Sequence, residues 1–482
     1  MCRMLLNSII LTTFTYSCCL AADGDKVFKA GAAASNITPP LGEMVVGGFV
    51  PFPSKTVHDE LHARCLVLDD GTTKLALVVC DNVGIPREVF DTAKKQVTEA
   101  TGIPAHCQLF SSSHTHSATT ARGENKVVAD VQLTGYQIFL ARRISDGVQR
   151  ALANLEPAKI GWGTAQAPEH VFNRRWYLKP NVQLRNPFGG FDRVQMNPGA
   201  GNVNLVEPAG PTDPEICFIS VQSTAGEPIA LLANYSLHYV GGVRSGEISA
   251  DYFAMFAEKV GPLVGAKRRY PPFVGIKANG TSGDVNNISF LKPRPRMQPY
   301  EQMENVAEDV AQKVAEAHKK VKFHDWVPLD AKLTELTLKV RKPNEEQITY
   351  AKEILAKPAD AEPYHRLEQH YAKRVMRLAE SPAEISIPLQ SVRIGELGVA
   401  AIPFEVFVEI GLEIKEKCPL GEAFTVSLAN GSYGYLPTPE HHALGGYETW
   451  MGTNSVEIEA SRKITARLLE MFQQLYAAPK TE

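Results

Sequence analysis

The stretch Gln108-Leu-Phe-Ser-Ser-Ser-His-Thr-His-Ser117 decides the fold, because an apolar run ends there in small polar residues and two histidines. A short apolar, β-branched run that gives way to a polar residue predicts a strand buried on both faces, followed by a loop. The same pattern recurs at residues 75–80 before Asp81, 229–234 before His238, 273–277 before Asp284, 399–402 before Glu405 and 424–428 before Tyr435. Ligands bind at the carboxyl ends of such strands, so these positions are the candidate site.

Helical patterns follow several of these runs. We expect helices over residues 87–101, 250–264 with Ser249 as N-cap, 406–417 and 457–476. The alternation predicts an α/β fold with mixed, largely buried sheets, flanking helices and catalytic residues at strand ends.

Residues 341–382 differ from the rest of the chain, since they are charged, punctuated by proline and apolar at helical spacing. This pattern predicts a helical insertion before the last strands. It is either a surface hairpin or a lid over the site, and the residues favour neither.

The first 22 residues resemble a signal peptide, with Arg3, an apolar core over residues 5–16 and a small-residue cleavage context at 19–22. A secreted or periplasmic protein is expected, with one catalytic domain over residues 27–478. A lipoprotein anchor at Cys18 or Cys19 is less favoured because neither cysteine follows a leucine-type lipobox. No other run reaches the roughly 18 apolar residues that span a bilayer, so no transmembrane span is expected in the mature chain.

Composition narrows the function further. The 482 residues are 44% hydrophobic and 21% charged, with a net charge of −3, which is typical of a globular protein and offers no basic face for nucleic acid. Five cysteines lie beyond the signal segment, widely spaced and without a CxxC pair, so neither a disulfide framework nor a thiolate zinc site is expected. Cys65, Cys80 and Cys107 lie in or beside apolar stretches and are expected to be buried thiols.

His114 and His116 carry the strongest chemical signal. In an extended backbone, positions i and i+2 point the same way, so one imidazole could bind a metal while the other transfers protons. Metal-assisted hydrolysis needs both functions, because the ion lowers the pKa of bound water and a neighbouring group then accepts or donates the proton. Two solvated loop histidines are the alternative.

Three further residues are weak signals individually. His238 ends an apolar run but could be a core histidine bonded to backbone. Glu405 opens the expected helix 406–417 and could simply complement its dipole. Tyr435 could be a packed loop aromatic.

Taken together, these residues resemble the neutral/alkaline (non-lysosomal) ceramidase family, zinc amidases that cleave the fatty-acyl amide of ceramide. The resemblance begins at Ala32-Ala-Ala-Ser-Asn-Ile-Thr-Pro-Pro-Leu41, passes through the His114 motif and covers about residues 30 to 455. It implies a Zn²⁺ ion held by His114, His238, Glu405 and Tyr435, a donor set that suits a hard to borderline cation.

The resemblance also implies catalytic roles. His116 would transfer protons, Arg174 in Asn173-Arg174-Arg175 would bind an oxyanion or a substrate hydroxyl, and Tyr447 in Gly446-Tyr447-Glu448 would line the substrate site. The expected substrate is an N-acyl amide, lipid or small molecule.

Three departures from the family pattern bear on the substrate. Asn286, in Gly283-Asp-Val-Asn-Asn-Ile288, stands where the family has a serine implicated in catalysis; an amide is no nucleophile but can donate to an oxyanion. Tyr239 replaces a proline after the second histidine, and Phe404 replaces the glycine before Glu405.

The chain also ends soon after residue 476, so the family's C-terminal β-sandwich domain is not expected. Two alternatives stay open: a hydrolase of a small soluble amide or ester on the same scaffold, or a non-catalytic exported binding protein on a decayed enzyme scaffold.

Overall fold

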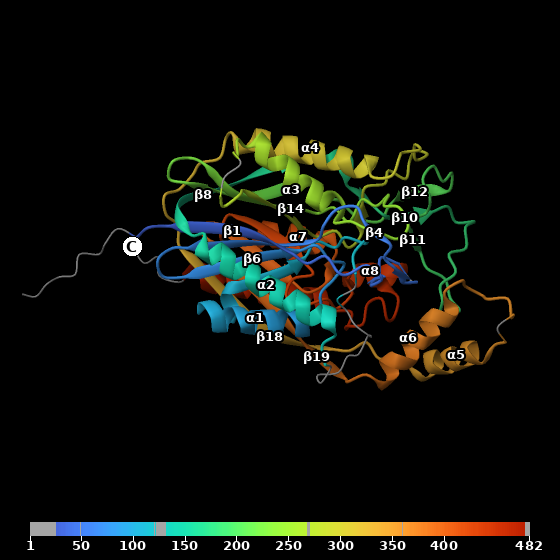
Figure 1. Cartoon of the computed structure of the whole chain (residues 1–482). Coiled ribbons are helices and arrows are strands. Elements are labelled where there is room, and N and C mark those ends of the chain that lie inside the picture. Colours follow the sequence, from blue (N-terminus) through green and yellow to red (C-terminus); the bar gives the residue numbers. More distant parts are fainter. Residues whose placement is uncertain are drawn as a thin grey trace, which may run out of the picture.

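The computed structural model describes residues 26–48, 50–119, 121, 132–267, 270–358 and 360–477 (Figure 1). The expected signal segment at residues 1–22 lies outside the described residues. Within them, no helix combines the length and the apolar character needed to cross a membrane.

The described residues form one large mixed sheet of eight strands. Its order is β16 (Val274–Asn279), β14 (Pro228–Tyr235), β13 (Glu215–Ser223), β8 (Glu156–Gln166), β1 (Lys29–Asn36), β5 (His62–Asp69), β6 (Lys74–Cys80) and β7 (Gln108–Ser112). Most neighbours are antiparallel, but β6 pairs with β7, and β14 with β16, in parallel. The strands expected to end in site residues are therefore among those with parallel partners.

A second sheet packs against the first. It has the order β18 (Leu329–Lys339), β19 (Glu384–Ile394), β20 (Leu397–Ile402) and β22 (Glu422–Ser427), with β20 and β22 parallel. Val79, Leu232, Val399 and Phe424, from both sheets, belong to one buried core. This packing explains why the strands are apolar on both faces.

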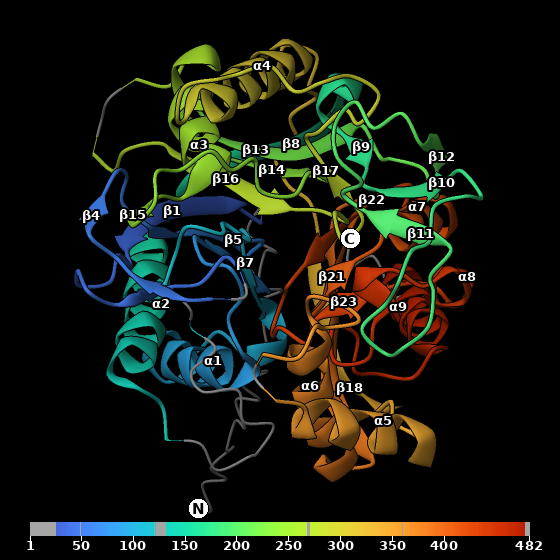
Figure 2. The same cartoon turned by 90° about the vertical axis from the view of Figure 1, so that its right-hand side faces the viewer.

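Helices cover the two outer faces (Figure 2). The first group lies on the eight-stranded sheet: α1 (Arg87–Thr101), α2 (Gly135–Ala153), α3 (Asp251–Leu263) and α4 (Glu301–His318). On the four-stranded sheet lie α7 (Val408–Lys417) and α9 (Ala460–Ala477). The expected α/β fold with buried sheets and flanking helices is confirmed.

Short strands and one short helix shape the loops at the site end. They are β2 (Met44–Val45), β3 (Phe52–Pro53), β4 (Thr56–Val57), β9 (Phe172–Asn173), β10 (Arg175–Leu178), β11 (Val194–Met196), β12 (Leu205–Pro208), β15 (Glu247–Ile248), β17 (Val285–Asn286), β21 (Glu405–Val406), β23 (Tyr435–Leu436) and α8 (Pro439–Leu444).

Three predicted helix starts are wrong by one to three residues, and the largest difference is at α9, which was expected from residue 457 and begins at Ala460. The helix expected at 406 begins at Val408, because Glu405 and Val406 form β21 with Tyr435 and Leu436 of β23. The helix expected at 250 begins at Asp251, and its N-cap is Ala250 rather than the predicted Ser249. The Ser249 hydroxyl still accepts from the Asp251 N–H at 3.0 Å. Helix 87–101 forms as predicted.

The insertion is a hairpin of two helices, α5 (Glu345–Ala356) and α6 (Glu368–Glu380), that projects from the body (Figures 1 and 2). Apolar side chains of both helices form a small core together with Met451 of the main body. Arg374 of α6 donates to the Gly452 carbonyl at 3.0 Å, and the Tyr371 ring packs on Trp450 at 5.1 Å. The hairpin thus supports the loop that carries Tyr447.

The five cysteines of the described residues are free and buried: Cys65, Cys80, Cys107, Cys217 and Cys418. The prediction of buried thiols, made for the first three, is confirmed. Burial raises the pKa of the Cys65 thiol to about 12, so this group stays protonated and packs as a small apolar side chain.

Candidate metal centre

His114 lies two residues beyond β7 in an unusual backbone conformation. Its φ is +75°, a left-handed value rare for residues other than glycine. The conformation is held by the His114 N–H, which donates to the Asn82 carbonyl at 2.9 Å. Such values cluster at functional sites, where the surrounding structure fixes them.

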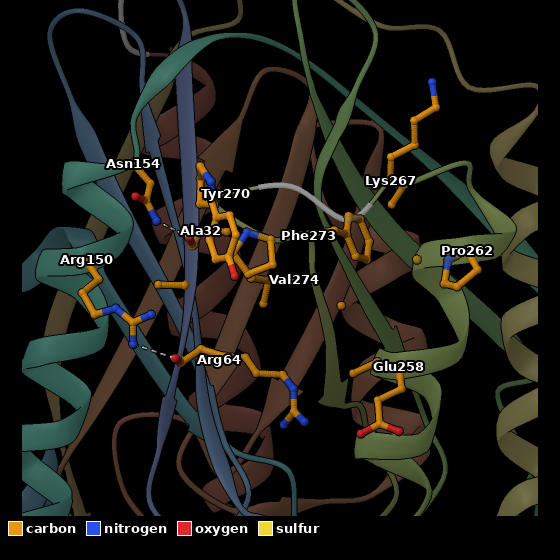
Figure 3. Close-up of a pocket in the computed structure, with 18 of the residues that line it drawn as sticks. Ala32, Arg64, Arg150, Asn154, Glu258, Pro262, Lys267, Tyr270, Phe273 and Val274 are labelled. Atoms are coloured by element: carbon orange, nitrogen blue, oxygen red, sulfur yellow. Dashed lines mark hydrogen bonds between the residues drawn. The ribbon is translucent and has the colours of Figure 1, made fainter.

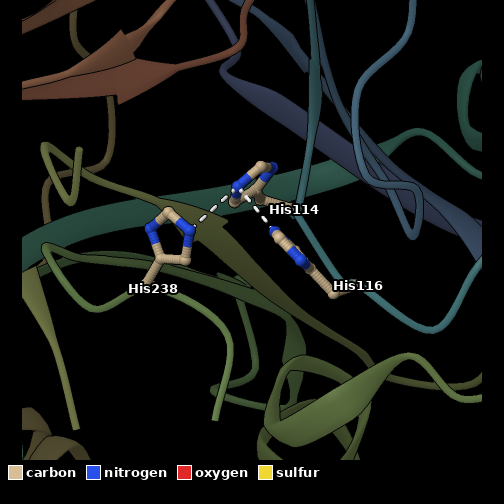
Figure 4. Close-up of side chains that lie close together, drawn as sticks. All are labelled: His114, His116 and His238. Carbon is tan, nitrogen blue, oxygen red and sulfur yellow. Dashed lines mark hydrogen bonds between the residues drawn. The ribbon is translucent and has the colours of Figure 1, made fainter. Parts of the chain in front are cut away.

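Three imidazoles meet at this point (Figure 4). Nε2 of His114 lies 3.1 Å from Nε2 of His238 and 3.1 Å from Nε2 of His116. His238 follows β14, and the other two follow β7, so the ends of both strands contribute. The expected convergence of His114 and His116 occurs, but through the left-handed turn at His114 rather than through an extended backbone.

Backbone carbonyls fix the tautomer of each ring. Nδ1 of His114 bonds the Val83 carbonyl at 2.5 Å, Nδ1 of His238 bonds Ser282 at 2.9 Å, and Nδ1 of His116 bonds Gly47 at 2.7 Å. A carbonyl oxygen can only accept, so each Nδ1 carries the hydrogen. In the neutral rings, all three Nε2 atoms therefore present lone pairs to one another.

Burial keeps two of these rings neutral. It lowers the pKa of His238 and of His116 well below the usual value, and the neighbouring His114 adds to the effect in both. Neutral imidazoles are the form that binds metals.

Glu405 and Tyr435 complete the cluster from the second sheet. They are paired residues of the parallel strands β21 and β23, and each is nine-tenths buried or more. Glu405 Oε2 lies 3.3 Å from His114 Nε2. All four residues of the expected zinc set therefore meet: His238 and Glu405 lie beside His114, and Tyr435 forms a hydrogen bond with Glu405.

The carboxylate is arranged as an anion. Burial alone would raise the pKa of Glu405, but His114, His238 and a hydrogen bond from Tyr435 hold it well below the usual range. Among the described residues, Glu405 Oε2 has no hydrogen-bond partner of good geometry. For Tyr435, burial and then Glu405 raise the pKa well above 10, so the phenol stays protonated although the neighbouring Arg174 guanidinium acts in the opposite direction.

This donor set fits a divalent cation. The lone pairs of the three Nε2 atoms and the anionic Oε2 of Glu405 repel one another unless a positive charge lies among them. A backbone carbonyl on the far side of each imidazole already orients the ring, as in metal sites. Two imidazoles, a carboxylate and a phenol are ligand types that zinc accepts. His114, His116 and His238 together form a group able to hold a metal ion.

Arg174 lies against the cluster in a buried ion network. Its Nη2 donates to Tyr435 Oη at 3.1 Å and to the Gly283 carbonyl at 2.7 Å, and its Nε donates to Glu448 at 3.0 Å. Glu448 also accepts from Arg175 at 2.8 Å. Arg174 thus places a fixed positive charge beside the phenol.

The two other predicted residues take different positions. The Tyr447 ring packs edge-on against Tyr435 at 5.8 Å, at the half-buried margin of the cluster. Asn286 donates from its amide to Asn197 Oδ1 at 2.8 Å, and among the described residues it forms no hydrogen bond with the histidines. Asn197 in turn donates from its backbone to the Arg174 carbonyl at 2.8 Å, so Asn286 reaches the site through one intermediate residue.

Several residues of the site were not predicted. Tyr239, noted only as a departure from a proline, stacks on His116 with ring centroids 3.8 Å apart. Gly47 approaches so closely that a Cβ there would meet the His116 carbonyl at 2.0 Å. The pair Gly47-Gly48 was the available signal for a close backbone approach.

A large hollow lies elsewhere on the molecule (Figure 3). It measures about 780 Å³ and runs between α2 and α3 over the small residues of β1, where Arg150 donates to the Ala34 carbonyl and Asn154 to the Ala32 carbonyl, both at 3.0 Å. No residue of the histidine cluster lines it. This hollow is therefore separate from the histidine cluster.

Comparisons with known proteins agree with this picture at the level of fold. No protein-family model matches the chain, and no curated protein matches it by sequence. Among solved structures, it is similar to the neutral ceramidase from Pseudomonas aeruginosa with a TM-score of 0.67, and to a ceramidase complexed with C2 with a TM-score of 0.68. Each match has 16% identity and covers 95% of this chain and 76% of the other. The chain therefore has the neutral ceramidase fold.

Proposed function

We propose that this protein is a zinc-dependent hydrolase that cleaves an N-acyl amide bond. His114, His238, Glu405 and Tyr435 would hold the ion. One observation carries the proposal: Nε2 of His114 lies 3.1 Å from Nε2 of both His238 and His116, beside the Glu405 carboxylate. The similarity to ceramidase structures supports the choice of an amide as the scissile bond.

Zinc, when bound, would activate water and polarise the carbonyl of the amide. His116 would move the proton. Its Nδ1 donates a hydrogen bond to the Gly47 carbonyl, so the lone pair of Nε2 faces the cluster. The ring of Tyr239 stacks on the imidazole and fixes its plane. His116 is more exposed than His114 and His238, so substrate and water would approach the cluster from its side.

Three other residues would bind the substrate. Arg174 carries a charge that its pairing with Glu448 holds in place, and it would stabilise the oxyanion of the tetrahedral state. Tyr447, at the margin of the cluster, would contact the acyl or amine portion. Asn286 would act as a hydrogen-bond donor with its second amide hydrogen, the first being bonded to Asn197.

The substrate class is tested by a hydrolysis screen of ceramides, N-acyl amino compounds of short chain length, and the matching esters. A lipid N-acyl amidase turns over ceramides with the higher kcat/KM. Turnover restricted to short polar substrates favours the second candidate, a hydrolase of small soluble amides or esters, for which the replacement of serine by Asn286 is the specific indication. No turnover of any substrate by the zinc-loaded protein contradicts the enzyme proposal.

The proton-transfer role has a matched control. His116→Gln removes the Nε2 base and is expected to lower kcat by about 10²- to 10⁴-fold, the usual contribution of general acid–base catalysis. His106→Gln changes an exposed histidine that faces solvent, and should leave kcat unchanged. Equal activity of the two variants would rule out His116 as the proton carrier.

A further inference from the structure

A second group of ionisable side chains lies on the other side of the turn that carries Asn286. Asp284, Glu409 and His441 each present a ligand atom, and these atoms lie within 4.8 Å of one another. They come from the turn after β16, the first turn of α7 and α8, respectively. Three segments far apart in sequence thus bring two carboxylates and an imidazole together.

Only part of the hydrogen-bonding capacity of this group is used. Asp284 Oδ1 accepts from the Val408 N–H at 3.0 Å and Oδ2 from Asn173 Nδ2 at 2.9 Å. These bonds fix the carboxylate and leave further lone pairs on its oxygens. His441 Nδ1 bonds the Thr438 hydroxyl at 2.8 Å, which orients the ring.

The remaining atoms have no hydrogen-bond partner of good geometry among the described residues: His441 Nε2 and Glu409 Oε2. His441 is only 5% exposed, and its Nε2 points at Glu409 Oε1 at 3.2 Å. A buried imidazole nitrogen aimed into a pair of carboxylates needs either a proton of its own or a cation between them.

The backbone leaves this space free of side chains. A Cβ on Gly210 would lie 2.7 Å from both Glu409 Oε1 and Asn173 Nδ2, and 3.5 Å from Asp284 Oδ2. Any larger residue at position 210 would fill the space between the carboxylates.

The neighbouring guanidinium of Arg175 forms its hydrogen bonds with other groups. Arg175 donates Nη1 to Glu448 and Nη2 to the Gly445 carbonyl at 2.7 Å. Asp284 and Glu409 thus place two carboxylates side by side in a largely buried position. Burial and the charge of Glu409 raise the pKa of Asp284 to about 7, so the pair carries fewer than two full negative charges unless a cation lies beside it. Such charges are normally paired or coordinate a metal.

We propose that Asp284, Glu409 and His441 form a second divalent-cation site, separate from the centre at His114. Two carboxylates with one imidazole suit a hard to borderline ion, so Mn²⁺ is the best match and Mg²⁺, which avoids imidazole, a weaker one. The site would hold the active-site turn in place, since the Asp284 carbonyl accepts the Arg174 N–H at 2.8 Å and the adjacent Gly283 carbonyl accepts the Arg174 guanidinium.

Mn²⁺ binding to chelator-treated protein, counted by the loss of the free-ion electron paramagnetic resonance signal, tests this directly. Glu409→Gln keeps the size of the side chain and removes its charge, and it should bind one Mn²⁺ fewer per chain than the wild type. His441→Asn should lose the same ion. The matched control is Glu413→Gln, on the same helix but exposed and paired with Lys417, which should bind as the wild type does.

A variant with both His114→Ala and His238→Ala separates the two sites, because it should keep the Mn²⁺ that depends on Glu409. Circular dichroism establishes that each variant is folded, and in the wild type Mn²⁺ should raise Tm more than it does in Glu409→Gln. The proposal is overturned if folded Glu409→Gln and His441→Asn bind as many ions as the wild type. It is also overturned if His441 titrates as a simple imidazolium paired to Glu409 and Mn²⁺ leaves its NMR signals unchanged.

Discussion

Arg174 donates a hydrogen bond from Nη2 to the phenol oxygen of Tyr435 at 3.1 Å, and both side chains are buried. The guanidinium is also centred 5.5 Å from the Tyr435 ring. Arg174 thus places a permanent positive charge beside Tyr435. Tyr435 is the proposed ligand whose proton is hard to remove, because the side chain is buried. The pairing links the proposed metal centre to the proposed oxyanion site through a single side chain.

Arg174→Lys tests this link. Lysine keeps the charge but cannot bond Tyr435, the Gly283 carbonyl and Glu448 with one planar group. We expect kcat/KM to fall by about 10²- to 10³-fold, as for the loss of an oxyanion-site donor. Arg193→Lys, at an exposed position, is the control. Full activity of Arg174→Lys would exclude a direct role.

Glu448→Gln should destabilise the fold. Glu448 is completely buried between Arg174 and Arg175, so its neutralisation leaves two buried cations without a carboxylate. Removing one member of a buried ion pair costs about 3–5 kcal/mol of the free energy of unfolding. Urea denaturation measures this against Glu440→Gln, whose exposed partner is Arg462. A difference below about 1 kcal/mol, the range of exposed pairs, would contradict the account.

Asn286→Asp tests whether the Asn286 amide acts as a hydrogen-bond donor or only fills space, because the two side chains have nearly the same shape. The substitution keeps the acceptor that receives the Ile288 N–H at 3.0 Å, but it turns the group that faces Asn197 Oδ1 into a second acceptor. If Asn286 donates to the oxyanion, kcat should fall by about 10²-fold or more while KM changes little. Asn286→Ser, which restores a short donor, should recover part of kcat. An unchanged kcat in Asn286→Asp would assign Asn286 a structural role alone.

Asp251 predicts a pH dependence of stability. Burial raises its pKa from 3.8 to about 6, against the opposing hydrogen bonds from Tyr252, Val240 and Gly241. The native state therefore holds this proton more tightly than the unfolded state does. The contribution to the free energy of unfolding is complete below pH 4 and declines as pH rises through about 6, by on the order of 1–3 kcal/mol.

Urea unfolding between pH 4 and pH 7 measures that slope. In Asp251→Asn the decline over this interval should be smaller, although the variant is less stable at the lowest pH because an amide cannot accept all three N–H groups. Asp325→Asn, at an exposed position, should keep the wild-type slope. Equal slopes for wild type and Asp251→Asn would show that another group is responsible.

Much of the fold could be predicted because its strands are short, apolar and ended by distinctive residues. The run before His238 became β14 and the run before Glu405 became β20, each within two residues of its expected bounds at either end. Burial on both faces explains the continuous apolar pattern, and the packing of a second sheet supplies that burial.

The local geometry at the site could not be predicted, since distant segments impose it. Glu405 was placed at a helix N-terminus, yet it belongs to β21, whose partner Tyr435 is 30 residues away along the chain (435 − 405). His114 takes a positive φ because its N–H reaches Asn82 and its ring reaches Val83. The local sequence His114-Thr115-His116 gives no indication of these partners.

Metal content tests the central claim most directly. Purified wild-type protein, analysed by inductively coupled plasma mass spectrometry after gel filtration, should contain about one zinc ion per chain at the His114 centre. His114→Ala and His238→Ala should each lose it, while His106→Ala retains it. Zinc kept at the wild-type level in both His114→Ala and His238→Ala would contradict the assignment of the metal centre.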